Sequence, residues 1–498
     1  MNKPLRRIAI FCGLLVLALL IRDNWIQYVQ ADSLKDDPKN RRVSIARYAT
    51  PRGDIIVDGN PITGSTKTSG DDFNDFEYKR TYKDGAMWAP VTGYASQAFG
   101  ATQLESIEDG ILTGNDDRLF FRRTLDMITG KKQEGGNVVT TLNGAAQKAA
   151  YNGLLKQGKG AVAAIDPSTG AILALASTPS YDPSTFAGNS LKGDSEAWEK
   201  LQKKNDPDNP MLNRALREIY PPGSTFKVVT AAAALEHGQY TDPDAKTDSP
   251  DPWTMPGTTT ELPNEGNIPC KNATLRIALR YSCNTVFGKV GFDLGKDKML
   301  ETAKKFGFNE EQFVPVRSSA SNFPTDMDKP QTALSSIGQF ETATTPLQMA
   351  MVAAAVANNG TLMKPYMVDK LQAPNLDVIE QSEPKKMSEP MSEENAQILQ
   401  SMMETVVKEG TGTRAQINED GITVGGKTGT AQRGVDNSEN PYAWFISYAK
   451  VKDGSSPVAV AVVVEDESAN RGDISGGGLA APIAKDVMKA VIDSKQGS

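Results

Sequence analysis

Histidine is almost absent from this chain of 498 residues, which contains one, His237. A Ser-His-Asp triad would need that residue, yet His237 lies 13 positions after Ser224, the serine in the most suggestive context, and roughly 20 Å away along one helix. The three cysteines include no Cys-x-x-Cys pair, so they and a lone histidine do not predict a zinc site. We expect His237 to end a helix and to contact its last carbonyl groups. The sequence therefore predicts chemistry without a metal or a cofactor.

The chain also lacks a long block of basic residues. Lysine and arginine number 54 and the acids 61, which gives a net charge of −7. This balance argues against nucleic acid as a partner. The length is sufficient for two or more domains, each with its own core.

Long apolar runs are missing except near the N-terminus, where residues 8–21 carry no charge. Fourteen such residues are short for a membrane span and are typical of a signal segment, but apolar neighbours on both sides extend them. We favour an uncleaved anchor in residues 1–22, with a cleaved signal peptide as the alternative. The basic residues Lys3, Arg6 and Arg7 predict an N-terminus in the cytoplasm and an exported body.

The cysteines have different expected roles. Cys12 lies inside the apolar segment, where we expect it to fill space. Cys270 and Cys283 lie in the exported part, 13 positions apart. A disulfide between them is plausible there, and two buried free thiols are the alternative.

Residues 23–155 are polar and rich in Asp, Gly and Thr, and they show no catalytic constellation. We predict a smaller, non-catalytic, mixed α/β module. Its expected elements are strands at 43–49, 53–57 and 137–142, a loop or hairpin over 65–80 and a helix at 104–112.

The composition changes at residues 158–160, and the second domain is predicted to span residues 156–498. Residues 161–165 and 171–176 are apolar runs around a turn and predict a hairpin. Strands at both ends of this half, with Ala-rich helices between them, suggest one sheet assembled from both termini and covered by helices. The remaining elements expected here are strands at 422–432, 442–449 and 458–464, a surface loop at 371–394 and an amphipathic helix at 479–492.

A Ser-x-x-Lys pair, Ser224 and Lys227, begins an apolar, Ala-rich run that ends at Gly238. The run predicts a buried helix, with Gly238 just past its end. Residues three apart share a helix face, so the two side chains are close enough to exchange a proton. Poor solvation would lower the pKa of Lys227 and make it a base for a nucleophilic Ser224. A plain core helix is the alternative.

Two other Ser-x-x-Lys matches have no helix to position them. Ser382 and Lys385 lie in a charged loop that contains a proline. Ser447 and Lys450 lie in a predicted strand, where residues three apart point to opposite faces. We set both pairs aside.

Two further motifs strengthen the first. Ser282 and Asn284 form a Ser-x-Asn after an amphipathic helix, at a helix end or short turn. Lys427, Thr428 and Gly429 form a Lys-Thr-Gly within a predicted strand. Each motif is weak alone, but in this order, each in a fitting element, they indicate β-lactamases and penicillin-binding proteins.

On these motifs the chain resembles the class B (monofunctional) penicillin-binding proteins, which are peptidoglycan D,D-transpeptidases. The resemblance covers nearly the whole chain and implies an α+β fold: a penicilloyl-serine transferase (β-lactamase-like) domain with a central antiparallel sheet. It departs from many relatives at Cys283, a position that we expect to matter little. Further stretches similar to the family are 51–59, 100–114, 160–178, 336–339 and 345–349.

The resemblance implies acyl transfer from a D-Ala-D-Ala stem peptide to Ser224, with Lys227 as base. Ser282 and Asn284 would relay protons, and the nearby cation Lys427 would help to keep Lys227 unprotonated. The serine would also be acylated by β-lactams. The residues expected to bind the substrate carboxylate, admit the ligand or complete the oxyanion hole are Lys427, Thr428, Gly429 and Thr430.

Two other functions use the same motifs. A D,D-carboxypeptidase or β-lactamase would pass the acyl group to water, and a β-lactam sensor or scaffold would only bind. The anchor and the N-terminal module argue against the first, and the complete set of motif residues argues against the second. The resemblance also implies a membrane glycan polymerase as partner, with the N-terminal module as its docking pedestal.

Overall fold

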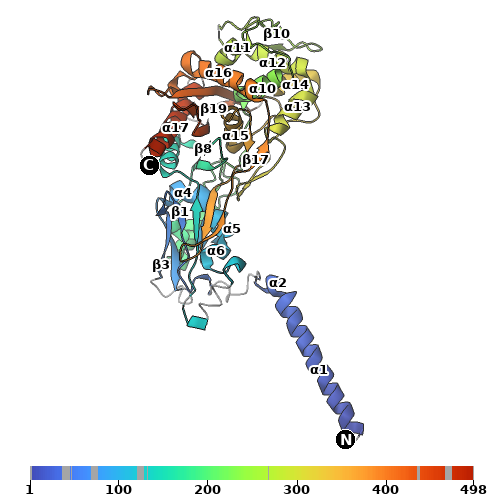
Figure 1. Cartoon of the computed structure of the whole chain (residues 1–498), viewed down its shortest axis with the longest axis vertical. Coiled ribbons are helices and arrows are strands. Elements are labelled where there is room, and N and C mark those ends of the chain that lie inside the picture. Colours follow the sequence, from blue (N-terminus) through green and yellow to red (C-terminus); the bar gives the residue numbers. More distant parts are fainter. Residues whose placement is uncertain are drawn as a thin grey trace.

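A computed structural model describes residues 3–35, 37, 45, 47–68, 77–120, 128–131, 133–266, 268–434, 438–465, 471 and 474–496. Figure 1 shows an isolated N-terminal helix, a smaller body that carries β1 and β3, and a larger body that carries β19 and the C-terminus.

The isolated helix is α1, Lys3–Tyr28, and the short α2, Ala31–Lys35, follows it. None of the 26 residues of α1 is buried in the protein. The helix is long and apolar enough to cross a membrane. It extends beyond the charge-free run of the sequence because flanking residues continue the helix.

The smaller body is built on a sheet in the order β16-β15-β7-β1-β2. β1 and β7 are parallel, and the other neighbours are antiparallel. β15 and β16 come from the middle of the predicted second domain, so the chain returns to complete the sheet of the first. The bounds are β1 Ile55–Val57, β2 Asn60–Pro61, β7 Asn137–Thr140, β15 Val368–Gln372 and β16 Val378–Gln381.

The surface loop predicted for residues 371–394 is therefore wrong. Leu371 is buried, but its neighbours on β15 are only partly buried and most of β16 is exposed. The sequence of this segment is therefore largely polar and lacks the apolar pattern that predicts strands. The strand β17, Lys386–Ser388, and the start of α16 also fall in this segment.

Around this sheet lie a hairpin and short helices. The predicted helix at 104–112 is divided at Glu108 into two short helices. A strand was predicted at 43–49, but the described residues of this stretch, 45 and 47–49, form no strand. The elements are β3 Thr63–Lys67, β4 Tyr78–Tyr82, α4 Gly85–Thr92, β5 Ala95–Ser96, β6 Gly100–Ala101, α5 Gln103–Ile107, α6 Asp109–Thr113 and η1 Asp117–Leu119. The next helix, α8 Gly144–Leu155, packs on the sheet of the larger body.

A buried ion cluster joins the parts of this body. Glu105 on α5 is fully buried, and its two carboxylate oxygens accept from Arg80 Nε at 2.6 Å and Arg52 Nε at 2.7 Å. Arg52 also contacts Asp109 at 2.6 Å. Two stretches that resemble the family, 51–59 and 100–114, meet in this cluster through the ion pairs of Arg52 with Glu105 and Asp109.

The larger body is built on an antiparallel sheet in the order β18-β19-β20-β8-β9. Both ends of the domain contribute to it, as predicted. β20 is buried along its whole length because helices cover both faces, which explains its continuous apolar sequence. The bounds are β8 Lys159–Ile165, β9 Ile172–Thr178, β18 Thr423–Arg433, β19 Glu439–Lys450 and β20 Val458–Glu465.

One face of this sheet packs against α8 and α17, and the other packs against α15 and the helices beyond it. The helices and turns of this body are η2 Pro183–Phe186, α9 Leu191–Leu201, η3 Gly223–Phe226, α10 Lys227–Glu236, α11 Leu275–Tyr281, α12 Asn284–Leu294, α13 Lys296–Lys305, α14 Lys329–Ser335, α15 Pro346–Ala357, α16 Glu393–Glu409, η4 Thr413–Ala415, η7 Gly476–Ala480 and α17 Ala481–Gln496. Short strand pairs are β10 Trp253–Thr254 with β11 Glu261–Leu262, β12 Gln312–Phe313 with β13 Arg317–Ser318, and β14 Leu362–Met363 with β17.

The helix α10 lies at the centre of this body, and its residues from Lys227 to Leu235 are buried. Small alanine side chains allow neighbouring helices to approach it on every side. Gly238 follows its end with a φ of +67°, as the sequence predicted. His237 follows the last residue of α10, as predicted, and its backbone N–H donates to the Ala233 carbonyl at 3.0 Å. Its ring turns to α13, where Nε2 lies 3.3 Å from Thr302 Oγ1.

Candidate active site

Ser224 lies in the 3-10 turn η3 that leads directly into α10. The turn is held from below by Gly338, whose carbonyl accepts from the Gly223 N–H at 3.0 Å. A Cβ atom at Gly338 would lie 2.1 Å from the Gly223 carbonyl oxygen, so only glycine fits there. This contact explains the family-like stretch at 336–339, which supports the backbone of the serine.

Lys227 is fully buried and surrounded by oxygen atoms. Its Nζ lies 2.9 Å from Ser224 Oγ and 3.2 Å from Ser282 Oγ, and it donates to the Ser282 carbonyl at 2.7 Å and to Asn284 Oδ1 at 2.6 Å. A neutral amine has two N–H groups, which these last two acceptors take. Its lone pair then faces the Ser224 hydroxyl, the arrangement that a base requires.

The electrostatics support the neutral form of this lysine. Burial lowers the pKa of Lys227 well below its ordinary value, and the nearby cation Lys427 lowers it further. Burial also lowers the pKa of Lys427, to about 7. The two lysines are thus placed so that one carries the charge and the other acts as base.

Ser282 lies in the tight turn between α11 and α12, and Asn284 is the first residue of α12, so the motif lies at a helix end, as the sequence predicted. Ser282 has a φ of +64°, an uncommon conformation for a residue with a side chain. The intervening Cys283 forms a disulfide with Cys270. The disulfide that the sequence made plausible is thus present, and it ties this turn to the loop that carries Cys270.

Lys427 projects from β18 opposite Ile446 of β19. Its Nζ lies 2.9 Å from Ser282 Oγ and donates to the Thr428 carbonyl at 2.7 Å. The hydroxyl of Ser282 therefore lies between the two lysine nitrogens, where it can pass a proton.

Gly429 lies on β18 against the turn that carries Ser224. A Cβ atom there would lie 2.9 Å from Thr225 Cγ2 and 3.0 Å from the Pro222 carbonyl oxygen. This close packing within the protein, rather than room for a ligand, explains the glycine. It brings Thr428 and Thr430 to the edge of the cavity.

A cavity of about 360 Å³ opens over these groups. Five of the predicted residues line it, and Lys227 and Lys427 lie beneath it. The sequence reasoning missed the others because they come from loops and from the ends of helices, which carry no periodic signal. Thr411 is one of them, with its Oγ1 2.6 Å from Thr428 Oγ1. The lining residues are Ser224, Glu265, Ile268, Tyr281, Ser282, Asn284, Thr411, Thr428, Thr430, Ser475, Gly476 and Gly477.

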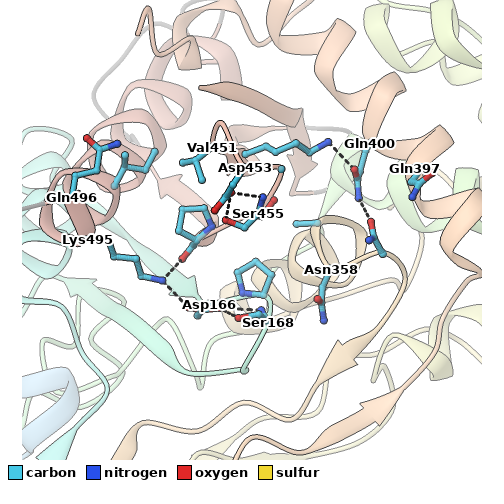
Figure 2. Close-up of a pocket in the computed structure, with 18 residues that line it drawn as sticks. Asp166, Ser168, Asn358, Gln397, Gln400, Val451, Asp453, Ser455, Lys495 and Gln496 are labelled. Atoms are coloured by element: carbon cyan, nitrogen blue, oxygen red, sulfur yellow. Dashed lines mark hydrogen bonds and ion pairs between the residues drawn. The ribbon is translucent and has the colours of Figure 1, made fainter. Parts of the chain in front are cut away.

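A larger cavity, of about 630 Å³, lies elsewhere on the same body (Figure 2). None of the predicted site residues lines it. Its charged groups are paired with neighbours: Lys495 Nζ lies 2.8 Å from Asp166, and Lys450 Nζ lies 2.9 Å from Gln400 Oε1. Among the described residues, no group of three or more His, Cys, Asp or Glu is placed to hold a metal ion. The chemistry belongs to the smaller cavity.

Two family models match the chain. Residues 160–489 match the penicillin binding protein transpeptidase domain, and residues 52–138 match the penicillin binding protein A dimerisation domain. The first region holds the larger body together with β15 and β16, and the second holds most of the rest of the smaller body.

Known proteins match over the same length. The chain is 40% identical over 501 residues to a Mycolicibacterium smegmatis protein named peptidoglycan D,D-transpeptidase PbpA, with 99% of each covered. It is 38% identical to the Mycobacterium tuberculosis protein of that name, over 99% of this chain and 100% of the other. A structure of penicillin-binding protein A from M. tuberculosis as a ceftriaxone acyl-enzyme complex is similar, with a TM-score of 0.83 and 37% identity, covering 90% of this chain and 100% of that one.

Proposed function

Since the chain belongs to the family of penicillin-binding protein transpeptidases, we propose that Ser224 is the nucleophile of its acyl transfer. The protein is a serine-type peptidoglycan D,D-transpeptidase that acts on D-Ala-D-Ala stem peptides and is acylated by β-lactams. One observation carries the assignment of the nucleophile: Ser224 Oγ lies 2.9 Å from the amine of a fully buried lysine whose pKa is lowered.

In the first step Lys227 takes the proton of Ser224 as Oγ attacks the carbonyl carbon of the penultimate D-Ala. Ser282 then passes a proton to the departing amine of the terminal D-Ala. Asn284 holds Lys227 in place through its Oδ1. The products are free D-Ala and an ester on Ser224.

The substrate is positioned by its charge and by backbone groups. Lys427, Thr428 and Thr430 bind the terminal carboxylate, and Gly429 keeps the strand close to the nucleophile. The backbone N–H groups of Ser224 and Thr430 form the oxyanion hole. Loss of one such donor costs roughly 10²–10³ in rate.

In the second step an amine of a neighbouring stem peptide attacks the ester. Transfer to water instead would make the enzyme a carboxypeptidase or a β-lactamase. Transfer to an amine and transfer to water share the first step, so only the fate of the acyl group distinguishes a transpeptidase from these hydrolases.

The fate of the acyl group is measured with the full chain in detergent, a benzoyl-D-alanyl thioester donor and an amine acceptor. We expect the amide product to exceed the hydrolysed acid when the acceptor is saturating. Ser224→Ala should form neither product. Hydrolysis alone, at every acceptor concentration, would contradict the transpeptidase and favour the carboxypeptidase.

The helix α1 is the membrane anchor in this proposal, and the smaller and the larger body both lie outside the cytoplasm. Its length and apolar composition, and the basic residues in its first two turns, support this orientation. A C-terminal alkaline phosphatase fusion should be active in cells, and a green fluorescent protein fusion exported by the same route should be dark. The opposite pattern would contradict the orientation.

The smaller body, with residues 23–155 and the returning β15 and β16, is the docking pedestal for a membrane glycan polymerase. Large apolar side chains are exposed on it, among them Phe120 and Val378, each 52% or more exposed. Phe120→Ser with Val378→Ser should reduce the polymerase that co-purifies with the full chain, as measured by mass spectrometry. Leu155→Ser, on α8, is the matched control. If the double variant and the control recover equal amounts of polymerase, this surface is not the docking site.

A further inference from the structure

The active-site cavity is poor in negative charge. Among the described residues that line it, Glu265 is the one carboxylate, and it lies in the loop that follows β11. Its side chain is exposed, and no described residue forms a hydrogen bond or an ion pair with it. A carboxylate held free at the rim of a reaction site is available to a ligand.

The loop that carries Glu265 is fastened to the catalytic turn at its near end. Asn284, whose Oδ1 accepts from Lys227, donates from Nδ2 to the Pro263 carbonyl at 3.1 Å. Asn264 accepts from the Thr285 N–H at 3.1 Å and donates to Thr285 Oγ1 at 2.9 Å. The residue before Glu265 is thus fixed to the first turn of α12.

The flanks of the loop are fixed as well. On one side Leu262 packs so closely on α12 that a Cβ atom at Gly288 would lie 2.6 Å from its Cδ2. On the other side Cys270 is bonded to Cys283, which lies between the two polar residues of the catalytic turn. The position of Glu265 therefore depends on the same turn that positions Lys227.

Charge decides which part of the reaction this carboxylate serves. The donor peptide has a terminal carboxylate, which Lys427 binds in the proposed function and which Glu265 would repel. The acceptor brings a primary amine, which is protonated in water near neutral pH. Glu265 also acts on both buried lysines, raising the pKa of each against the larger lowering by burial, so its field reaches the reacting groups.

We propose that Glu265 binds the ammonium group of the acceptor stem peptide, a role that rests on the transpeptidase function. The amine nitrogen forms the new C–N bond as the bond between the acyl carbon and Ser224 Oγ breaks. Of the two protons that the ammonium loses on becoming an amide, one goes to Ser224 Oγ through Lys227 and the other to solvent. Glu265 guides the cation to the ester and exchanges no proton with it.

The test measures partition of the acyl-enzyme with the full chain in detergent and the thioester donor. The acceptors are Nα-acetyl-lysine amide and its neutral counterpart, Nα-acetyl-6-hydroxynorleucine amide. In Glu265→Gln we expect about a tenfold rise in the lysine-acceptor concentration at which aminolysis equals hydrolysis, as for loss of one charge-assisted contact. Partition to the alcohol, which carries no ammonium group, should change less than about twofold.

Glu261→Gln on β11 is the matched control, because Glu261 is exposed on the same hairpin but does not line the cavity. An unchanged partition in Glu265→Gln overturns the proposal while leaving the transpeptidase function intact. An equal loss with the amine and the alcohol also overturns it, since that result indicates a loosened loop. If the wild-type protein acylates but transfers to no amine, the transpeptidase function itself fails, and the acceptor site with it.

Discussion

At the scale of the residue, the chemistry depends on two buried lysines with different charges. Each donates to a backbone carbonyl, and Ser282 Oγ lies within 3.2 Å of both nitrogens. Burial penalises charge on either one. Because the charge on Lys427 further lowers the pKa of Lys227, the pair favours a single proton, on Lys427.

This division predicts the pH dependence of acylation. Lys227 must be neutral, so the rate rises as the pH passes through its lowered pKa from below. Lys427 must be charged to bind a carboxylate, and its pKa is about 7, so the rate falls as the pH rises above that value. The second-order rate constant for benzylpenicillin should therefore decline from pH 7 to pH 9. A rate that climbs steadily over this range would contradict the assignment of the charge to Lys427.

A second prediction concerns the base itself. Lys227→Met keeps the volume of the side chain and removes the amine, so acylation should slow by about 10²–10⁴-fold. The fold should persist, because the variant buries no unpaired charge. Stopped-flow acylation and a thermal melt measure the two effects. Lys385→Met, in the Ser-x-x-Lys match that we set aside, should leave both unchanged.

The sequence could predict these residues because short motifs in a fixed order carry the information. It could not predict Glu265 or Thr411, which lie in loops, because the spacing of residues along a loop does not determine where their side chains lie in the folded protein. The position of Glu265 depends on contacts with Asn284 and Thr285, about 20 residues away in the chain, and those contacts exist only after folding.

At the scale of the element, the strands of the larger body were predictable because helices cover both faces, which produces runs of apolar residues. The strands β15 and β16 were not, because one face meets solvent and their sequence is largely polar. The helix at 104–112 was predicted in place, but not its break at Glu108, which no glycine or proline marks.

The buried charges of the smaller body give a prediction at this scale. Glu105→Gln leaves Arg52 and Arg80 without their shared carboxylate, and breaking a buried ion pair costs about 3–5 kcal/mol. Urea unfolding of the full chain should show a first transition at a lower midpoint. Asp117→Asn, an exposed acid in the same body, should change the free energy of unfolding by less than about 0.5 kcal/mol. Equal effects from both variants would contradict a structural role for the cluster.

At the scale of the whole molecule, the two bodies are linked by more than one connection. The chain leaves the smaller body after β7 and returns to it through β15 and β16, the orange strands beside β1 in Figure 1. β7 pairs with β1 on one side and with β15 on the other. The sequence predicted a single domain boundary near residue 155. No pattern in it indicates that the later strands β15 and β16 pair with β7 of the smaller body.

A fragment experiment tests this arrangement. Residues 23–155 alone lack β15, which leaves one edge of β7 unpaired, so the fragment should fail to fold. Joining residues 364–385 to it by a flexible linker should restore a cooperative thermal transition. Circular dichroism compares the two fragments, and cooperative unfolding of 23–155 alone would contradict the need for the returning strands.

The central claim is that Ser224, with Lys227 as base, forms the acyl-enzyme. Intact-mass analysis after incubation with benzylpenicillin tests it most directly, with a time course after excess drug is removed. The account predicts a stable adduct of one penicilloyl group on the wild-type protein and on Ser382→Ala, and none on Ser224→Ala. An adduct on Ser224→Ala, or no adduct on the wild-type protein, would contradict it.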